Sequence, residues 1–250
     1  NSTGHADMIQ LADGRWYMVS LGKRNDLDGD ANMGRETYLI PMKWEPTIVK
    51  WEQVSETKWQ PVKYLFPVAA PMTGKVERFF PLPFPEKPQY INNSYIDDFT
   101  SSNLKLDWTF IRVPIQNTIS LTDNPGHLRL YPQSTTIENR KNFSMIGFRQ
   151  RESDFDFQVK MNFMPKKNKV ESGIIHYQKE RNYLTSVVYK VGKKFFLEQM
   201  LKEKDKNVTS LKKVHLKKYS GSIIFKTESR EDRYTFYYSL DNGETFTSFN

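Results

Sequence analysis

The chain has 250 residues, of which 38% are hydrophobic and 14% aromatic, and its formal net charge is +8. This composition excludes a globally disordered chain and favours β structure, because aromatic and β-branched side chains suit pleated, half-buried surfaces. The absence of cysteine excludes disulfides and thiolate metal sites. No apolar run approaches the roughly 20 residues that cross a bilayer, so we expect no membrane partner.

The first elements in chain order are two strands, at residues 5–11 and 16–21, around a turn at Asp13-Gly14. Residues 25–32 are rich in Asp, Asn and Gly but lack the bidentate Glu of an EF-hand, so we interpret them as a solvated loop. Two separate strands are then expected, over residues 37–44 and 48–54.

Prolines recur from Pro61 to Pro88, which excludes helix and favours extended segments with edge or linker character. Residues 81–88 are the best candidate for a linker. The expected domains are therefore 1–88 and 95–250.

Short strands separated by turns fill residues 95–250, at intervals of about ten residues, a spacing typical of a β-sandwich. The expected strands are 108–113, 127–131, 155–163, 183–191, 194–201, 222–227 and 234–240. Many lysines lie between residues 190 and 218, where they suit solvent faces and strand edges. Since no nucleic-acid-binding motif accompanies them, we expect no nucleic-acid partner.

Two sets of motifs carry a family resemblance. The first set is Gly4-His5-Ala6-Asp7, residues 14–19 and Gly34-Arg35-Glu36-Thr37, and the second is Asp97-Asp98-Phe99, Leu106-Asp107-Trp108 and residues 110–112, 120–122, 125–130 and 171–174. In this order they resemble glycoside hydrolase family 43, in its β-xylosidase and α-L-arabinofuranosidase branch. The resemblance implies an all-β chain: the last part of a five-bladed β-propeller over 1–88, then a concanavalin A-like β-sandwich over 95–250 that ends before the family's last strands.

The resemblance also implies an activity. Inverting glycosidases use a carboxylate base and a carboxylic acid, spaced widely enough to admit a water molecule, and a third carboxylate tunes the acid's pKa. The family carries all three upstream of its Gly-His-Ala segment, so we assign no catalytic residue in this chain. We expect the C-terminal part of an exo-acting enzyme of xylan degradation, inactive alone, whose partner is a xylo- or arabino-oligosaccharide. The alternative is a non-catalytic carbohydrate-binding sandwich.

Two residues match binding positions of the family. Arg35 matches an arginine that hydrogen-bonds sugar hydroxyls, and His5 matches a histidine of the funnel floor that in some members reaches a central calcium through water. No cofactor is required, and calcium is an optional one. Without the resemblance, a single histidine in a strand indicates a residue packed in the core, and an Arg-Glu pair indicates an ion pair on the surface. The resemblance favours binding roles for both, with Glu36 orienting Arg35.

Some points stay open in the sequence. Trp16 and Trp108 fit a packed core, whereas Trp51 and Trp59 fit either packing or stacking on sugar rings. Residues 43–61 form a longer connection than the family's. The exposed apolar area of an incomplete propeller favours a homo-oligomer. Extracellular and cytoplasmic locations, and xylose and arabinose preferences, are equally open.

Overall fold

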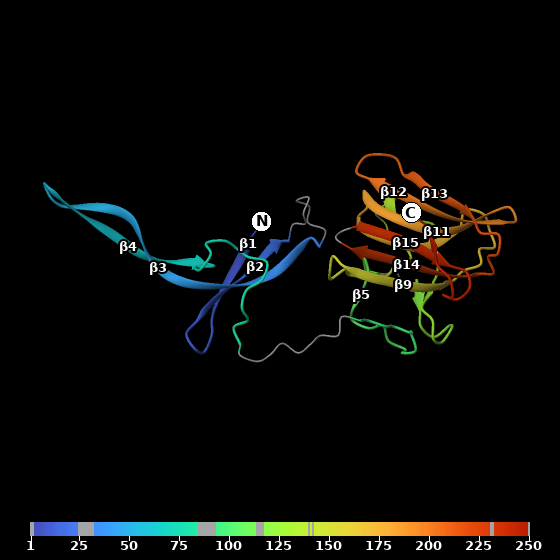
Figure 1. Cartoon of the computed structure of the whole chain (residues 1–250), viewed down its shortest axis with the longest axis horizontal. Coiled ribbons are helices and arrows are strands. Elements are labelled where there is room, and N and C mark those ends of the chain that lie inside the picture. Colours follow the sequence, from blue (N-terminus) through green and yellow to red (C-terminus); the bar gives the residue numbers. More distant parts are fainter. Residues whose placement is uncertain are drawn as a thin grey trace. The chain divides into compact units, whose positions relative to one another are not determined.

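The computed structural model describes residues 3–24, 33–84, 94–113, 118–139, 141, 143–230 and 233–249. The chain divides into two compact units, residues 1–92 and 93–250, which Figure 1 shows as separate groups of strands. Within the described residues, the regular elements are β-strands and one short 3₁₀ helix, η1 (Ile137–Asn139). The expected all-β class is therefore confirmed. None of the described helical structure is long and apolar enough to cross a membrane.

The first unit is one antiparallel sheet in which four strands follow each other in chain order. The strands are β1 (Gly4–Gln10), β2 (Trp16–Lys23), β3 (Arg35–Ser55) and β4 (Lys58–Ala69). The expected hairpin between β1 and β2 is present, and Gly14 at its turn has a φ of 86°, a backbone conformation that glycine adopts without strain. The solvated loop expected over 25–32 lies outside the described residues.

The expectation of two separate strands over 37–44 and 48–54 is wrong. β3 is a single strand of 21 residues, because its backbone stays paired with β4 through both runs. β2 accompanies β3 only as far as Met42, so residues 43–55 and 58–68 continue as a two-stranded antiparallel ribbon. We call this part the β3–β4 ribbon. Figure 1 shows it extending well beyond β1 and β2.

The second unit contains two sheets of four strands each. One sheet has β10 (Glu171–Lys179), β11 (Asn182–Val191), β12 (Lys194–Glu203) and β13 (Thr209–His215). The other has β16 (Thr247–Ser248), β15 (Arg233–Ser239), β14 (Ser222–Arg230) and β9 (Phe155–Asn162). Two short pairs accompany them: β5 (Trp108–Thr109) with β8 (Gly147–Phe148), and β6 (Ile119–Ser120) with β7 (Arg129–Leu130).

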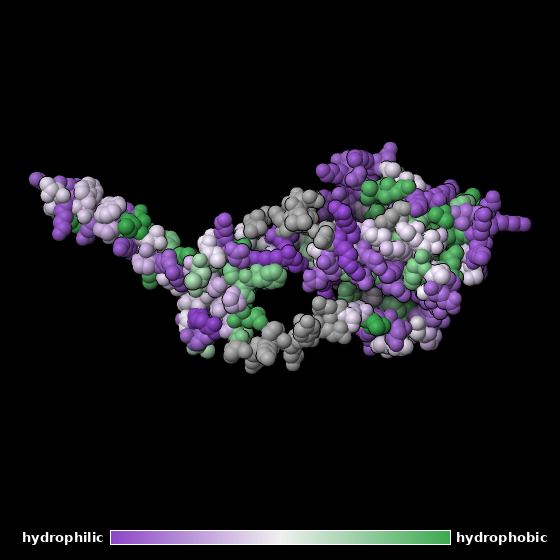
Figure 2. Space-filling view, in the orientation of Figure 1, coloured by the Kyte–Doolittle hydropathy of each residue, from purple (hydrophilic) through white to green (hydrophobic). Residues whose placement is uncertain are grey.

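The core of the second unit lies between the two sheets. Val188 and Leu197 contribute to it from β11 and β12, and Phe225, Phe236 and Phe249 contribute from the opposite sheet or just beyond it. Half-buried and exposed positions alternate along β9, in the period that the sequence pattern predicts. The result is a β-sandwich, and the face of it that Figure 2 shows carries hydrophilic side chains interspersed with apolar patches.

Candidate functional site

His5 lies in β1 at an irregular point of the sheet. Gly4 pairs with Leu21 and Asp7 with Val19, so β1 holds one more residue than β2 at this point, which is a β-bulge. His5 has a φ of 54°, in the left-handed region. A non-glycine residue in that region stores about 1–3 kcal/mol of strain, and such residues cluster at functional sites. Its side chain is exposed.

Arg35 is the first residue of β3 and pairs with Lys23 at the end of β2. Its side chain is exposed. Glu36, which was expected to orient Arg35, instead accepts two hydrogen bonds from the guanidinium of Arg24, with N–O distances of 3.0 and 3.1 Å. The reason is strand alternation: neighbouring residues of a strand point to opposite faces, so Glu36 and Arg35 diverge. Sequence reasoning missed Arg24, which directly follows β2.

The sheet brings His5 and Arg35 to the same end. One row of paired residues across β1, β2 and β3 consists of Gly4, Leu21 and Thr37. His5 comes one residue after this row in β1, and Arg35 comes two residues before this row in β3. β2 lies between their strands, which are roughly 10 Å apart, and the two residues are offset by three positions along the strands, so their backbones are roughly 14 Å apart. The bulge interrupts alternation at His5, and pairing alone therefore does not put both side chains on one face. A shared sugar-sized hollow at these residues stays a prediction.

A surface hollow of about 310 Å³ lies at the opposite end of the sheet. The hollow forms at the start of β2, beyond which β3 has no partner on that side among the described residues. Its lining includes Arg15, Trp16 and Trp44. The two indole rings meet edge to face with centroids 5.6 Å apart. Arg15 forms an ion pair with Asp13 at 2.6 Å, and its hydrogen bonds to Asp13 lower the pKa of that carboxyl. Trp16 is therefore a packed residue, as expected, and this hollow is separate from His5 and Arg35.

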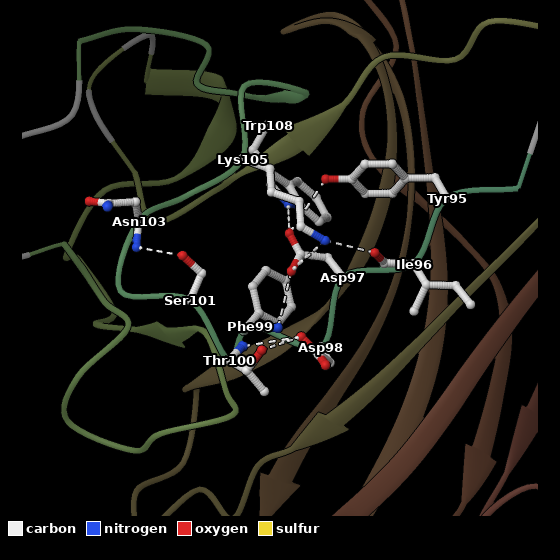
Figure 3. A network of polar contacts seen from close by, with 10 residues as sticks. All are labelled: Tyr95, Ile96, Asp97, Asp98, Phe99, Thr100, Ser101, Asn103, Lys105 and Trp108. Carbon is white, nitrogen blue, oxygen red and sulfur yellow. Dashed lines mark hydrogen bonds and ion pairs between the residues drawn. The ribbon is translucent and has the colours of Figure 1, made fainter. Parts of the chain in front are cut away.

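The motif around Asp97 forms a structural network in the second unit, shown in Figure 3. The Asp97 carboxylate accepts a hydrogen bond of 2.7 Å from the Trp108 indole and one of 3.0 Å from the Phe99 backbone. The ammonium of Lys105 lies 3.4 Å away. Burial by itself raises the pKa of Asp97, but these hydrogen bonds and Lys105 outweigh it and lower the pKa.

The same network binds its own segment together through side-chain packing. The ring of Trp108 packs against those of Tyr95 and Phe99, with centroids 6.3 and 5.6 Å apart. Trp108 is therefore a packed residue, as expected. Asp97 and Trp108 thus connect the motifs at 97–99 and 106–108 within one segment of the sandwich.

No cluster of three or more His, Asp or Glu side chains that could hold a metal occurs among the described residues. His5 by itself is not a calcium site, because calcium takes six to eight oxygen ligands. In the second unit, His176 is largely enclosed in the sandwich, and His127 and His215 lie elsewhere and are exposed.

Comparison with known proteins gives consistent results. The family model of the beta xylosidase C-terminal concanavalin A-like domain matches residues 96–250. A non-reducing end alpha-L-arabinofuranosidase of Bacteroides ovatus is 32% identical over 237 residues, which are 93% of this chain and 40% of that protein. A xylosidase/arabinosidase of Butyrivibrio fibrisolvens is 30% identical over 191 residues, which are 76% of this chain and 33% of that protein.

Solved structures agree in fold. A glycoside hydrolase of the Bacteroides ovatus xyloglucan locus has a TM-score of 0.78 and 28% identity, and the match covers 99% of this chain and 45% of that one. A protein of the same family from Bacillus licheniformis also has a TM-score of 0.78, with 23% identity, over 98% of this chain and 43% of that one.

The sandwich and its matches define the class: an all-β chain whose second unit is a concanavalin A-like domain of the kind found at the C-terminus of beta xylosidases. The chain belongs to glycoside hydrolase family 43, and it corresponds to the C-terminal part of the relatives. It spans less than half the length of the curated relatives it matches.

Proposed function

We propose that this chain is the C-terminal part of an exo-acting, inverting glycosidase that releases terminal xylose or arabinose from xylan-derived oligosaccharides. The observation that carries the proposal is the match to the Bacteroides ovatus arabinofuranosidase, which extends over 93% of this chain and joins both units in one alignment. In the proposal the base, the acid and the third carboxylate belong to residues outside 1–250, and the chain alone is inactive.

Residues 1–88 act in this proposal as the last part of a β-propeller. A propeller blade is a sheet of four antiparallel strands, and β1 to β4 have that number and order. The sheet also exposes apolar side chains that neighbouring blades would cover, among them Met8, Ile9, Val19 and Leu39. These exposed faces support an origin in a larger ring of sheets.

Arg35 and His5 are the proposed substrate-binding residues. A guanidinium offers a rigid fork of donors that fits the vicinal hydroxyls of a pentose. His5 would orient water near the sugar. Its bulge and its positive φ support this role, since such positions occur beside active sites. Any calcium at this point would need oxygen ligands in addition to His5.

A chimera tests the proposal. The matching C-terminal part of the Bacteroides ovatus enzyme is replaced by this chain, and hydrolysis of aryl α-L-arabinofuranoside and aryl β-xyloside is measured. We expect activity from the chimera and none from the chain alone. Arg35→Ala should lower kcat/KM roughly 10- to 100-fold, because hydrogen bonds to charged groups contribute about 1.5–3 kcal/mol. Lys23→Ala, at the residue paired with Arg35, is the matched control and should keep activity.

Clear turnover by the chain alone would refute the placement of the carboxylates. The second candidate function is a sugar-binding sandwich without catalysis, favoured by the position of the family match at residues 96–250. Glycan binding that does not respond to Arg35→Ala, together with an inactive chimera, would favour that candidate.

A further inference from the structure

The β3–β4 ribbon has two chemically different faces. Strand pairs point to the same side, so the register Trp51↔Pro61 and Gln53↔Trp59 places both tryptophans on one face. That face, which we call the Trp face, also carries Trp44, Ile48 and Leu65.

The opposite face, which we call the charged face, carries two ion pairs along β3. Lys43 pairs with Glu45, and Lys50 pairs with Glu52 at 2.6 Å. Tyr64 and Phe66 lie on this face as well. The two kinds of side chain are therefore segregated by strand alternation.

The Trp face is open to solvent. The side chains of Trp51 and Trp59 are 57% and 55% exposed, and Leu65 is 64% exposed. Trp51 and Trp59 are diagonal neighbours, so their Cα atoms are about 7–8 Å apart. A two-stranded ribbon is at best marginally stable in water. An exposed apolar face on such a ribbon therefore indicates a binding surface.

Charge indicates what kind of ligand covers it. In the paired rows of residues 43–68, all of which the structure describes, Lys63 is the single charged residue of the Trp face. In a face-to-face pair of two ribbons, two such ammonium groups would lie against apolar surface without a carboxylate, and unpaired like charges oppose association. A neutral ligand that stacks on indole faces avoids this cost, and the C–H faces of pyranose rings have that chemistry.

We infer that Trp51 and Trp59 form an accessory binding site for a neutral, polyhydroxylated glycan chain, separate from the pentose subsite at Arg35. The inference rests on the proposed function for its choice of glycan. It gives a role to two tryptophans that packing within the ribbon does not bury.

The test measures binding of the full chain to soluble neutral xylan by affinity electrophoresis, and to xylohexaose by calorimetry. We expect Trp51→Ala with Trp59→Ala to weaken binding about tenfold, since each aromatic contact contributes a several-fold factor. Trp51→Tyr with Trp59→Tyr should keep most of the binding. Tyr64→Ala, at an equally exposed aromatic on the charged face, is the matched control and should leave binding unchanged.

Each other result overturns the inference. Undetectable glycan binding by the wild-type chain does so, as does equal weakening by Tyr64→Ala. Binding that is lost in Arg35→Ala but kept in the double alanine variant also does so, while leaving the proposed function intact. A sedimentation shift with concentration that disappears in the double variant, without glycan binding, would assign the face to a second copy of the chain.

Discussion

Replacing His176 by glutamine tests how the sandwich responds to acid. The imidazole of His176 on β10 lies between the two sheets, where Nε2 is 3.0 Å from Oγ1 of Thr227 on β14. Its ring meets those of Tyr234 and Phe236 edge to face, with centroids 5.6 and 5.4 Å apart. Burial lowers the pKa of His176 from 6.5 to about 4.

The sign and size of the effect follow from this pKa. The unfolded chain binds a proton at His176 as the pH falls through 6.5, whereas the folded chain does so only near 4. Between these values the unfolded state holds more protons, so the free energy of unfolding decreases as the pH falls. The contribution is intact above about pH 6.5, and over the whole window it amounts to about 3 kcal/mol.

The assay is urea unfolding followed by circular dichroism, at several pH values between about 7 and 4. We expect His176→Gln to lose about 3 kcal/mol of this pH dependence, since an amide does not titrate but can still bond Thr227. His215→Gln, at a solvent-exposed histidine of β13, is the matched control and should follow the wild type. If the wild type and His176→Gln give parallel curves across this range, the reasoning is wrong.

Two further predictions concern the same unit. A Cβ at Gly173 would lie 1.9 Å from the backbone oxygen of Ser186, so Gly173→Ala should separate β10 from β11 and greatly reduce the soluble yield. Gly147→Ala, whose nearest atoms are 3.8 Å away, should be tolerated, and equal yields would contradict the steric argument. Asp97→Asn weakens a buried acceptor of several bonds and should lower the free energy of unfolding by about 1–3 kcal/mol in thermal melts. Asp98→Asn at the exposed neighbour should cost much less, and similar losses would show that burial is not the cause.

The sequence predicts the sandwich well where alternation is regular. Phe155, Phe157, Val159 and Met161 alternate with polar residues, and β9 follows that pattern. β13 was missed because it is an edge strand with several polar residues, and its alternation is weak. β10 was missed although part of it carried the family resemblance.

The first unit shows a different limit. The run of β3 looks interrupted in the sequence because Pro46 stands between its two apolar stretches, yet the strand continues with a bulge at Val49. The partner of Glu36 could have been anticipated from alternation along the strand. The bulge at His5 could not, because an extra residue is defined only by the strand it pairs with.

The ribbon accommodates an extra residue in β3 without changing what it presents on each side. Ile48 pairs with Lys63 and Lys50 with Val62, so Val49 has no counterpart on β4. Ile48 and Trp51 are three residues apart, a spacing that puts side chains on opposite faces of a regular strand, and the bulge absorbs Val49 so that both lie on the Trp face. Deleting Val49 would leave Lys50 opposite Val62 and Trp51 opposite Pro61, so the two indoles would stay neighbours. An insertion in β3 that no bulge absorbs would instead turn Trp51 toward the ion pairs, while Trp59 on the other strand kept its orientation.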